Sequence, residues 1–308
     1  MPASYITPDV LLRQPAGLAW DVVPTLTADL VEKRAQLALV CHQVTSLIDG
    51  FLHQPLRSVI VTEQVQFPGH PRASMDRHTG IVSLVTRQWP VTAVNAVQVS
   101  PARAFPAMFS LVPAQHTRIR TPVLQPMSGQ PVTGASGGNM IDIAPGSIAG
   151  RDHRRGAFLI SYSTTTGYPH SLLTAVAAEG AESLATDDVT GWAGFSGWIL
   201  DGPMTEFMQV ADVSAAEDSQ LPGAGGTVQA GPGTLTLEEG LRNPHGPGAL
   251  LTAMPLAALQ AAALSAAVIA LEHITAIAAQ SSSGMLPGGL GSLAFESEKA
   301  LEPFQRIA

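Results

Sequence analysis

The sequence predicts an α+β fold, in which a helical core with a small β-sheet carries an inserted small β-domain. Two long stretches with helical character, one towards each end of the chain, predict the helical core. Between them, short runs of β-branched residues alternate with glycine and proline turns, which is typical of strands. We expect the core to comprise residues 1–170 and 249–308, and the inserted β-domain to comprise residues 171–248.

The first two helices are predicted by their end signals and by the spacing of apolar residues. The segment Thr7–Asp9 combines a hydroxyl cap with proline at the first helical position, so we expect a short helix to about Arg13. A long helix is expected from Thr27, its N-cap, to about Asp49, with Gly50 as its stop. Its apolar positions fall close to helical spacing: Leu30, Leu37, Val40, Cys41, Val44, Leu47, Ile48 and Phe51.

The strands of the core are expected from residue 57 onwards, where β-forming residues begin to alternate with polar ones. Further short strands are expected at residues 140–143 and 158–162. A long loop rich in glycine, proline and serine is expected at residues 125–138. One face of the strand that follows Pro90 is expected to carry every second residue: Val91, Ala93, Asn95, Val97 and Val99.

The inserted β-domain is predicted by short strands between regular turn signals. These strands are expected at residues 183–184, 198–200, 207–210 and 234–237. After Pro255 the helical pattern resumes to about Ala279, and a Ser/Gly/Pro loop, flexible by composition, is expected at residues 281–291. A short helix over Glu296–Arg306, bent by Pro303, is expected after this loop.

The composition favours an oligomer and argues against nucleic-acid wrapping. Only 13% of the 308 residues are charged, about half the usual share. Interface cores are depleted in Lys, Glu and Asp, so low charge favours a homo-oligomer. The net charge of −8 argues against wrapping of a DNA duplex, which needs clustered cations to replace phosphate counterions. DNA could still slide past such a surface without specific binding.

Metal sites and membrane spans are not predicted. Cys41 is the single cysteine, and no two histidines stand three or four residues apart, so we expect no metal and no cofactor. The segment Ala249–Leu271 has no charged residue, but alanine dominates it, and Pro255 and Gln260 interrupt it. It is therefore interpreted as a packed helix and not as a membrane span.

Two groups of residues indicate contacts of other kinds. Small side chains along the last long helix suit either packing between subunits or an intramolecular core, because they let helix backbones approach closely. The residues concerned are Ala263, Ala266, Ala267 and Ala270. The basic cluster of Arg151, Arg154 and Arg155 could contact DNA phosphates or, as the better interpretation, acidic residues of a neighbouring subunit.

No constellation of residues predicts an enzyme. Asp201, Glu206 and Asp212 are the strongest candidates, because strand geometry could bring two of these carboxylates together for acid–base chemistry. Exposure in a turn-rich β-domain makes solvation the better explanation, so we expect no catalytic residue. A cleft that joined them would favour the alternative of a hydrolytic or carbohydrate-binding β-domain.

Five parts of the sequence, taken in order, carry a resemblance to a known family. They are the helix Leu30–Phe51 with its ending Ile48-Asp49-Gly50-Phe51, Val61-Thr62-Glu63 followed by Gly80–Leu84, Trp89–Val94, Phe158–Tyr162 followed by Gly167-Tyr168-Pro169, and Leu301–Arg306. In this order they resemble the head-to-tail connector (adaptor) proteins of long-tailed bacteriophages, over residues 5–170 and 250–308. The segment between these two regions has no counterpart in a minimal adaptor.

The resemblance implies a helical adaptor core and a structural role in the virion neck, after assembly in the host bacterial cytoplasm. Such proteins form a homo-oligomeric ring of about twelve subunits, which joins the capsid portal to the stopper or tail and extends the DNA channel. It also implies docking of the C-terminal tail on the portal through Leu301, Phe304 and Arg306, while the insertion could contact the capsid. The alternative is another virion structural protein, such as a stopper, tail terminator or baseplate subunit.

Overall fold

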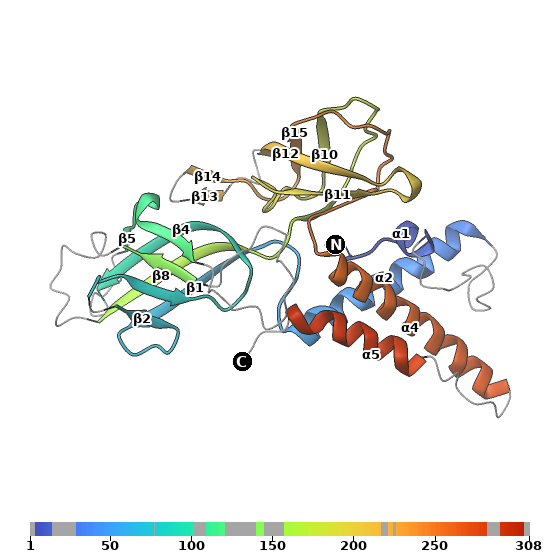
Figure 1. Ribbon diagram of the computed structural model, residues 1–308, viewed down its shortest axis with the longest axis horizontal. Coiled ribbons are helices and arrows are strands. Elements are labelled where there is room, and N and C mark those ends of the chain that lie inside the picture. The colour runs from blue at the N-terminus through green and yellow to red at the C-terminus, as the bar shows by residue number, and fades with distance from the viewer. Residues whose placement is uncertain are drawn as a thin grey trace.

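The computed structural model describes residues 4–13, 29–76, 78–101, 109–120, 140–144, 157–216, 221–223, 226–281 and 290–304. Figure 1 shows three parts. Strands β1, β4 and β8 lie at one end of the molecule, a second group of strands around β12 lies above, and helices α1, α2, α4 and α5 lie beside both. The segments that form one part come from distant regions of the chain, as the colours of the ribbon show.

The fold is mostly antiparallel β-sheet, so the expectation of a helical adaptor core with a small β-sheet is wrong. Within the described residues there are two sheets of four strands, one of six, a two-stranded hairpin and four α-helices. The physical reason is that the strands pair over long distances, as β1 (Val59–Phe67) does with β8 (Phe158–Thr166). Long-range pairing leaves no local periodic signal, whereas two long helices dominate the pattern of the sequence.

The first part contains both four-stranded sheets, in the orders β1-β8-β4-β5 and β2-β3-β7-β6. Their other strands are β2 (Ala73–Met75), β3 (Val82–Val85), β4 (Val91–Pro101), β5 (Ser110–Leu111), β6 (Thr117–Arg120) and β7 (Met140–Ile143). The two sheets share one apolar core, to which Val97, Ile141 and Tyr162 contribute. The strands expected at residues 140–143 and 158–162 are confirmed, and the loop expected at residues 125–138 lies outside the described residues.

Strand β4 does not keep the alternation that the sequence predicts. Val91 and Val97 are buried, but Ala93, expected on the same face, is exposed. The pairing with β8 shifts register between Val91 and Ala93, and again between Val94 and Ala96. Each shift adds a residue to one strand and so changes the face to which the following side chains point.

The second part is a six-stranded antiparallel sheet in the order β10-β15-β12-β11-β16-β9. Its strands are β9 (His170–Leu172), β10 (Ser183–Thr186), β11 (Ser196–Leu200), β12 (Glu206–Ala215), β15 (Gly233–Leu237) and β16 (Leu250–Thr252). It has an apolar core of its own, in which Trp192 and Leu235 are fully buried. A hairpin of β13 (Leu221–Gly223) and β14 (Gly226–Val228) extends towards the first part (Figure 1). The four strands expected here from the sequence are present.

Helix α2 spans Leu30–Leu52 and differs from its prediction at both ends. It begins at Asp29, whose carboxylate accepts a hydrogen bond of 3.0 Å from the backbone N–H two residues later. Thr27, the predicted cap, lies outside the described residues. The helix runs through Gly50 because Leu52 packs into the core, and it ends where His53 adopts a left-handed conformation.

The other helices follow the predicted order. α1 spans Pro8–Arg13 and α4 spans Leu256–Ser281, both close to their expected bounds. α5 spans Leu290–Leu301 and is followed by a 3-10 turn over Glu302–Phe304, so the final helix begins earlier than predicted. Among the described residues, no helix is both long and apolar enough to cross a membrane.

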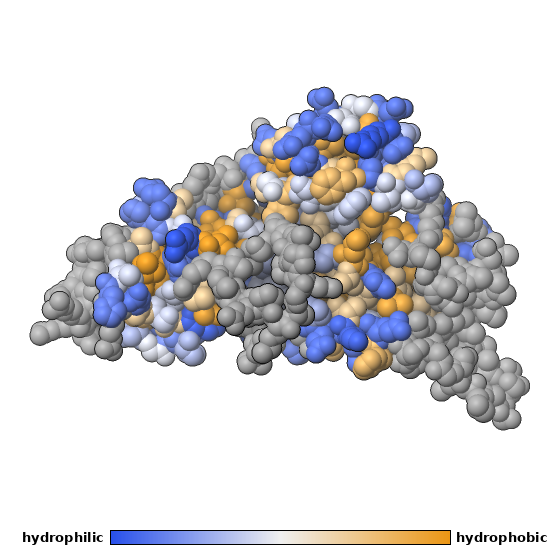
Figure 2. All heavy atoms as spheres, viewed as in Figure 1, coloured by the Kyte–Doolittle hydropathy of each residue, from blue (hydrophilic) through white to orange (hydrophobic). Residues whose placement is uncertain are grey.

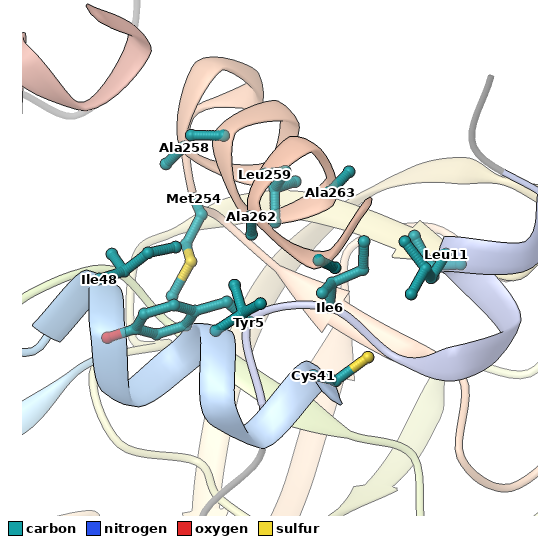
Figure 3. Packing of buried hydrophobic residues seen from close by; sticks show 14 of the residues in the cluster. Tyr5, Ile6, Leu11, Cys41, Ile48, Met254, Ala258, Leu259, Ala262 and Ala263 are labelled. Atoms are coloured by element: carbon teal, nitrogen blue, oxygen red, sulfur yellow. The ribbon is translucent and has the colours of Figure 1, made fainter. Parts of the chain in front are cut away.

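The helices pack around the N-terminal segment. Figure 3 shows Tyr5 and Ile6 between α4 and α2, with Met254 and Ile48 against the tyrosine ring. Tyr5 is nearly fully buried, and its hydroxyl bonds to the carboxylate of Asp49 and accepts the backbone N–H of Leu56 at 2.7 Å. The N-terminal segment is therefore part of the core of the helical part, packed between α2 and α4.

His170 joins this segment to the six-stranded sheet. Its Nε2 lies 2.8 Å from the backbone carbonyl of Ser4, and its Nδ1 lies 3.1 Å from the hydroxyl of Thr252. A carbonyl only accepts hydrogen bonds, so the neutral ring carries its proton on Nε2, and Nδ1 accepts from the hydroxyl. The ring of Tyr5 packs edge-on against the imidazole, with centroids 5.8 Å apart.

Candidate functional site

Helix α2 carries four large apolar side chains that are open to solvent. Val31, Leu39 and Leu47 are 74%, 66% and 59% exposed, and Phe51 is 37% exposed. They stand eight, eight and four residues apart, with Ala35 and Gln43 between them, so they follow an i, i+4 row that winds about 200° around the helix from Val31 to Phe51. We call these four residues the α2 stripe.

The α2 stripe is also uncharged along most of its length. No Lys, Arg, Asp or Glu occurs between residues 35 and 48. The opposite face of the helix supplies Leu37, Cys41, Val44 and Ile48 to the core against α4. The helix therefore carries apolar side chains on its solvent-facing side as well as on its buried side, and the solvent-facing side also carries the polar residues Glu32, Gln43 and Ser46. Large exposed apolar side chains that gather on one helix make it a candidate interaction site.

The alanines that were considered for packing between subunits are buried within the chain itself. Ala263, Ala266, Ala267 and Ala270 are between 0% and 6% exposed and belong to the core between α4 and its neighbours. Their small side chains let α2 and α5 lie close to α4, which is the intramolecular alternative that the sequence left open.

The residues considered for docking on a portal are either buried or outside the described residues. Leu301 and Phe304 are 3% and 7% exposed, and the ring of Phe304 packs edge-on against Tyr168 at 6.5 Å. A partner could touch these two side chains only if α5 left the core. Arg306 lies outside the described residues, as do Arg151, Arg154 and Arg155.

The structure brings two of the three candidate carboxylates together, on a histidine that the sequence did not single out. His245 has a fully buried side chain, with Nδ1 at 3.2 Å from Asp201 Oδ2 and Nε2 at 2.7 Å from Glu206 Oε1. Both contacts are hydrogen bonds when the ring carries a proton on each nitrogen, because carboxylates only accept. Asp212 lies apart from this group, exposed on β12.

Glu206 is held by more than His245. Its two oxygens also accept the backbone N–H groups of Arg242 at 2.9 Å and Asn243 at 3.2 Å. Burial acts to raise the pKa of Glu206, but the hydrogen bonds from Arg242, His245 and Asn243 outweigh it and lower that pKa. An ionised carboxylate that already accepts three hydrogen bonds is a poor proton acceptor at neutral pH. The group of Asp201, Glu206 and His245 therefore fastens the loop 239–245 to β12; we call it the His245 clamp.

Sequence reasoning missed the clamp because His245 is separated from Glu206 by 39 residues and stands in no motif. The Asn-Pro-His-Gly sequence around it reads only as a turn. Within the described residues, no group of His, Cys, Asp and Glu is arranged to hold a metal ion.

The fold and these surfaces define a mostly antiparallel β-protein with an attached helical cluster. No family model, no curated protein and no solved structure matches the chain.

Proposed function

We propose that this chain is a structural subunit of a phage neck, which forms an oligomeric ring between portal and tail or stopper and extends the DNA channel. The α2 stripe is the observation that carries the proposal, because it is a surface suited to a second copy of the chain. The order of sequence segments that resemble head-to-tail connector proteins supports the location in a neck. The proposal does not rest on a helical core, since the fold is mostly β.

The α2 stripe is large enough to contribute to association. Full burial of one large aliphatic or aromatic side chain stabilises by roughly 1.5–3 kcal/mol. Scaled by the exposed fractions of Val31, Leu39, Leu47 and Phe51, complete covering of the stripe would remove apolar surface worth roughly 3.5–7 kcal/mol from water. In a ring each subunit contributes two different surfaces, so the stripe would meet another face of the next copy.

The charge of the chain is consistent with a channel for DNA. A net charge of −8 gives an acidic subunit, and acidic walls do not hold phosphates. The charged residues of α2 lie at its two ends, as Glu32, Lys33 and Arg34 at one end and Asp49 at the other. The middle of α2 carries no charged residue, so it is suited to apolar contact with a neighbouring subunit.

The test is the mass of the purified protein in solution, measured by light scattering after size-exclusion chromatography. We expect an oligomer, seen as rings by negative-stain electron microscopy. Leu39→Glu should shift the population to monomers, because it places a charge in the centre of the stripe. Val176→Glu is the matched control, since Val176 is 74% exposed, close to the 66% of Leu39, but lies in the inserted sheet region.

Circular dichroism of both variants shows whether the fold is kept. A wild-type chain that remains monomeric at high micromolar concentration would falsify the ring proposal. An oligomer that Leu39→Glu leaves intact would move the interface away from the α2 stripe and remove the observation on which the proposal rests.

A further inference from the structure

A pocket of about 490 Å³ opens on the solvent-facing side of the six-stranded sheet. One wall is the pair of strands β11 and β12, and the other is the loop 239–243. Its volume falls in the range of about 300–1,000 Å³ that is usual for small-ligand pockets. Figure 2 shows hydrophilic and hydrophobic residues side by side on the surface of this upper part of the molecule.

Two aromatic side chains form the apolar side of the pocket. Trp198 and Phe207 are direct partners across β11 and β12. Their rings lie 5.2 Å apart at 69°, in an edge-to-face arrangement. Trp198 remains 38% exposed and Phe207 52% exposed, whereas Trp192 in the same sheet region is fully buried. An exposed aromatic face offers a flat, electron-rich surface on which the C–H face of a sugar ring can stack.

Beside these rings and the apolar Met208, Leu237 and Leu241, the pocket is lined by polar groups with donors and acceptors. Thr205 and Gln209 point outwards from the same row of the hairpin as Phe207, because the residues between them are buried. Glu239, Arg242 and Asn243 face them from the loop. These amide, carboxylate and guanidinium groups can hydrogen-bond neighbouring hydroxyls on one ligand.

The charges in the pocket favour a neutral ligand. Arg242 is the single cation of the lining, and the carboxylates of Glu206 and Glu239 stand with it. A phosphate or another anion would meet more negative than positive charge here. A ligand that is neutral, rich in hydroxyls and partly apolar on one face fits both walls.

The pocket is held in shape before any ligand enters. The His245 clamp binds the backbone of Arg242 and Asn243, so the loop wall is fixed relative to β12. At the other end of the loop, the backbone N–H of Glu238 donates to the carbonyl of Gln209 at 3.0 Å. Because the wall is already formed, less conformational entropy is lost when a ligand binds.

We propose that this pocket binds carbohydrate, with a neutral sugar unit stacked on Trp198 and its hydroxyls bound by Gln209, Arg242 and Asn243. The inference is independent of the proposed ring, because it concerns a different face of the chain. On this proposal the inserted sheet binds glycans, and the His245 clamp positions the loop wall of the pocket.

The experiment is saturation-transfer difference NMR on the full chain with methyl glycosides of glucose, galactose, mannose, rhamnose and N-acetylglucosamine. We expect at least one glycoside to receive saturation, and Trp198→Ala to weaken its binding by at least about tenfold. Gln209→Ala is the second variant, since Gln209 is exposed and its loss does not touch the core. Phe295→Ala removes a 66%-exposed aromatic residue from α5 and is the matched control.

Three results decide the proposal. Loss of binding in Trp198→Ala and Gln209→Ala, with binding kept in Phe295→Ala, supports it. Absence of saturation transfer to all five glycosides overturns it. Binding that survives in both pocket variants also overturns it, because the sugar then lies elsewhere on the chain.

Discussion

Acidification is expected to destabilise this protein through His170. Burial, the largest cause, lowers the pKa of His170 from 6.5 to about 4, and the nearby positive charge of Arg57 adds to this. The hydrogen bond to Ser4 and the charge of Asp188 oppose the shift but do not cancel it. The folded protein therefore keeps this imidazole neutral, whereas the unfolded chain protonates it as soon as the pH falls below about 6.5.

The sign and size of the effect follow from linkage. As the pH falls, the unfolded state binds the proton before the folded state does. The contribution of His170 to the free energy of unfolding is therefore complete above pH 6.5 and is lost as the pH falls towards 4. At about 1.4 kcal/mol per pH unit, the loss from His170 reaches about 2 kcal/mol at pH 5 and about 3 kcal/mol at pH 4. Below the folded pKa both states are protonated, and the loss levels off.

The assay is urea unfolding at pH 7, 5 and 4, for the wild type and for His170→Gln. Glutamine retains an N–H donor that can reach the Ser4 carbonyl, and it does not titrate. We expect the free energy of unfolding of the wild type to fall by about 3 kcal/mol more than that of the variant between pH 7 and pH 4. Parallel pH profiles, or an NMR titration that places the pKa of His170 near 6.5, would refute the reasoning.

Two further predictions concern residues that the sequence placed in other roles. Glu206→Gln should lower the free energy of unfolding by about 1.5–3 kcal/mol at pH 7, because it removes the charge that binds His245. The difference in stability between the wild type and Glu206→Gln should shrink as the pH falls through the lowered pKa of Glu206. Asp212→Asn is the control, and it should change the free energy of unfolding little because Asp212 is exposed. Phe304→Ala should lower the free energy of unfolding by about 3 kcal/mol, measured by thermal or urea unfolding, because the ring of Phe304 is buried. Phe295→Ala should leave it nearly unchanged, because Phe295 is exposed. Equal effects of the two substitutions would contradict the packing of the 3-10 turn.

The sequence predicted local elements well where a local signal exists. α1 begins at the proline that was expected to start it, because a hydroxyl and a proline set the first turn without help from the rest of the chain. α4 keeps its predicted bounds because alanine favours helix and Pro255 precedes it. The helix end at Gly50 was wrong, because the burial of Leu52 outweighs the preference of glycine for a helix stop.

The candidate sites were less predictable than the elements. Leu47 and Phe51 fit the same apolar spacing as Ile48, so periodicity alone could not show that they lie on an open face. The aromatic pair of the pocket depends on the register that places Trp198 opposite Phe207. Spacing in the sequence carries no information on which strand will supply the partner.

By itself, the sequence determined the positions of most helices and strands, the low charge and the absence of a second cysteine. Only the tertiary structure decided that β-sheet dominates, that the alanines of α4 are already buried, and that Asp201 and Glu206 meet on His245. The physical reason is the range of the interactions. Helix caps and turns depend on neighbours within a few residues, whereas strand pairing, burial and the meeting of charged groups depend on segments brought together by folding.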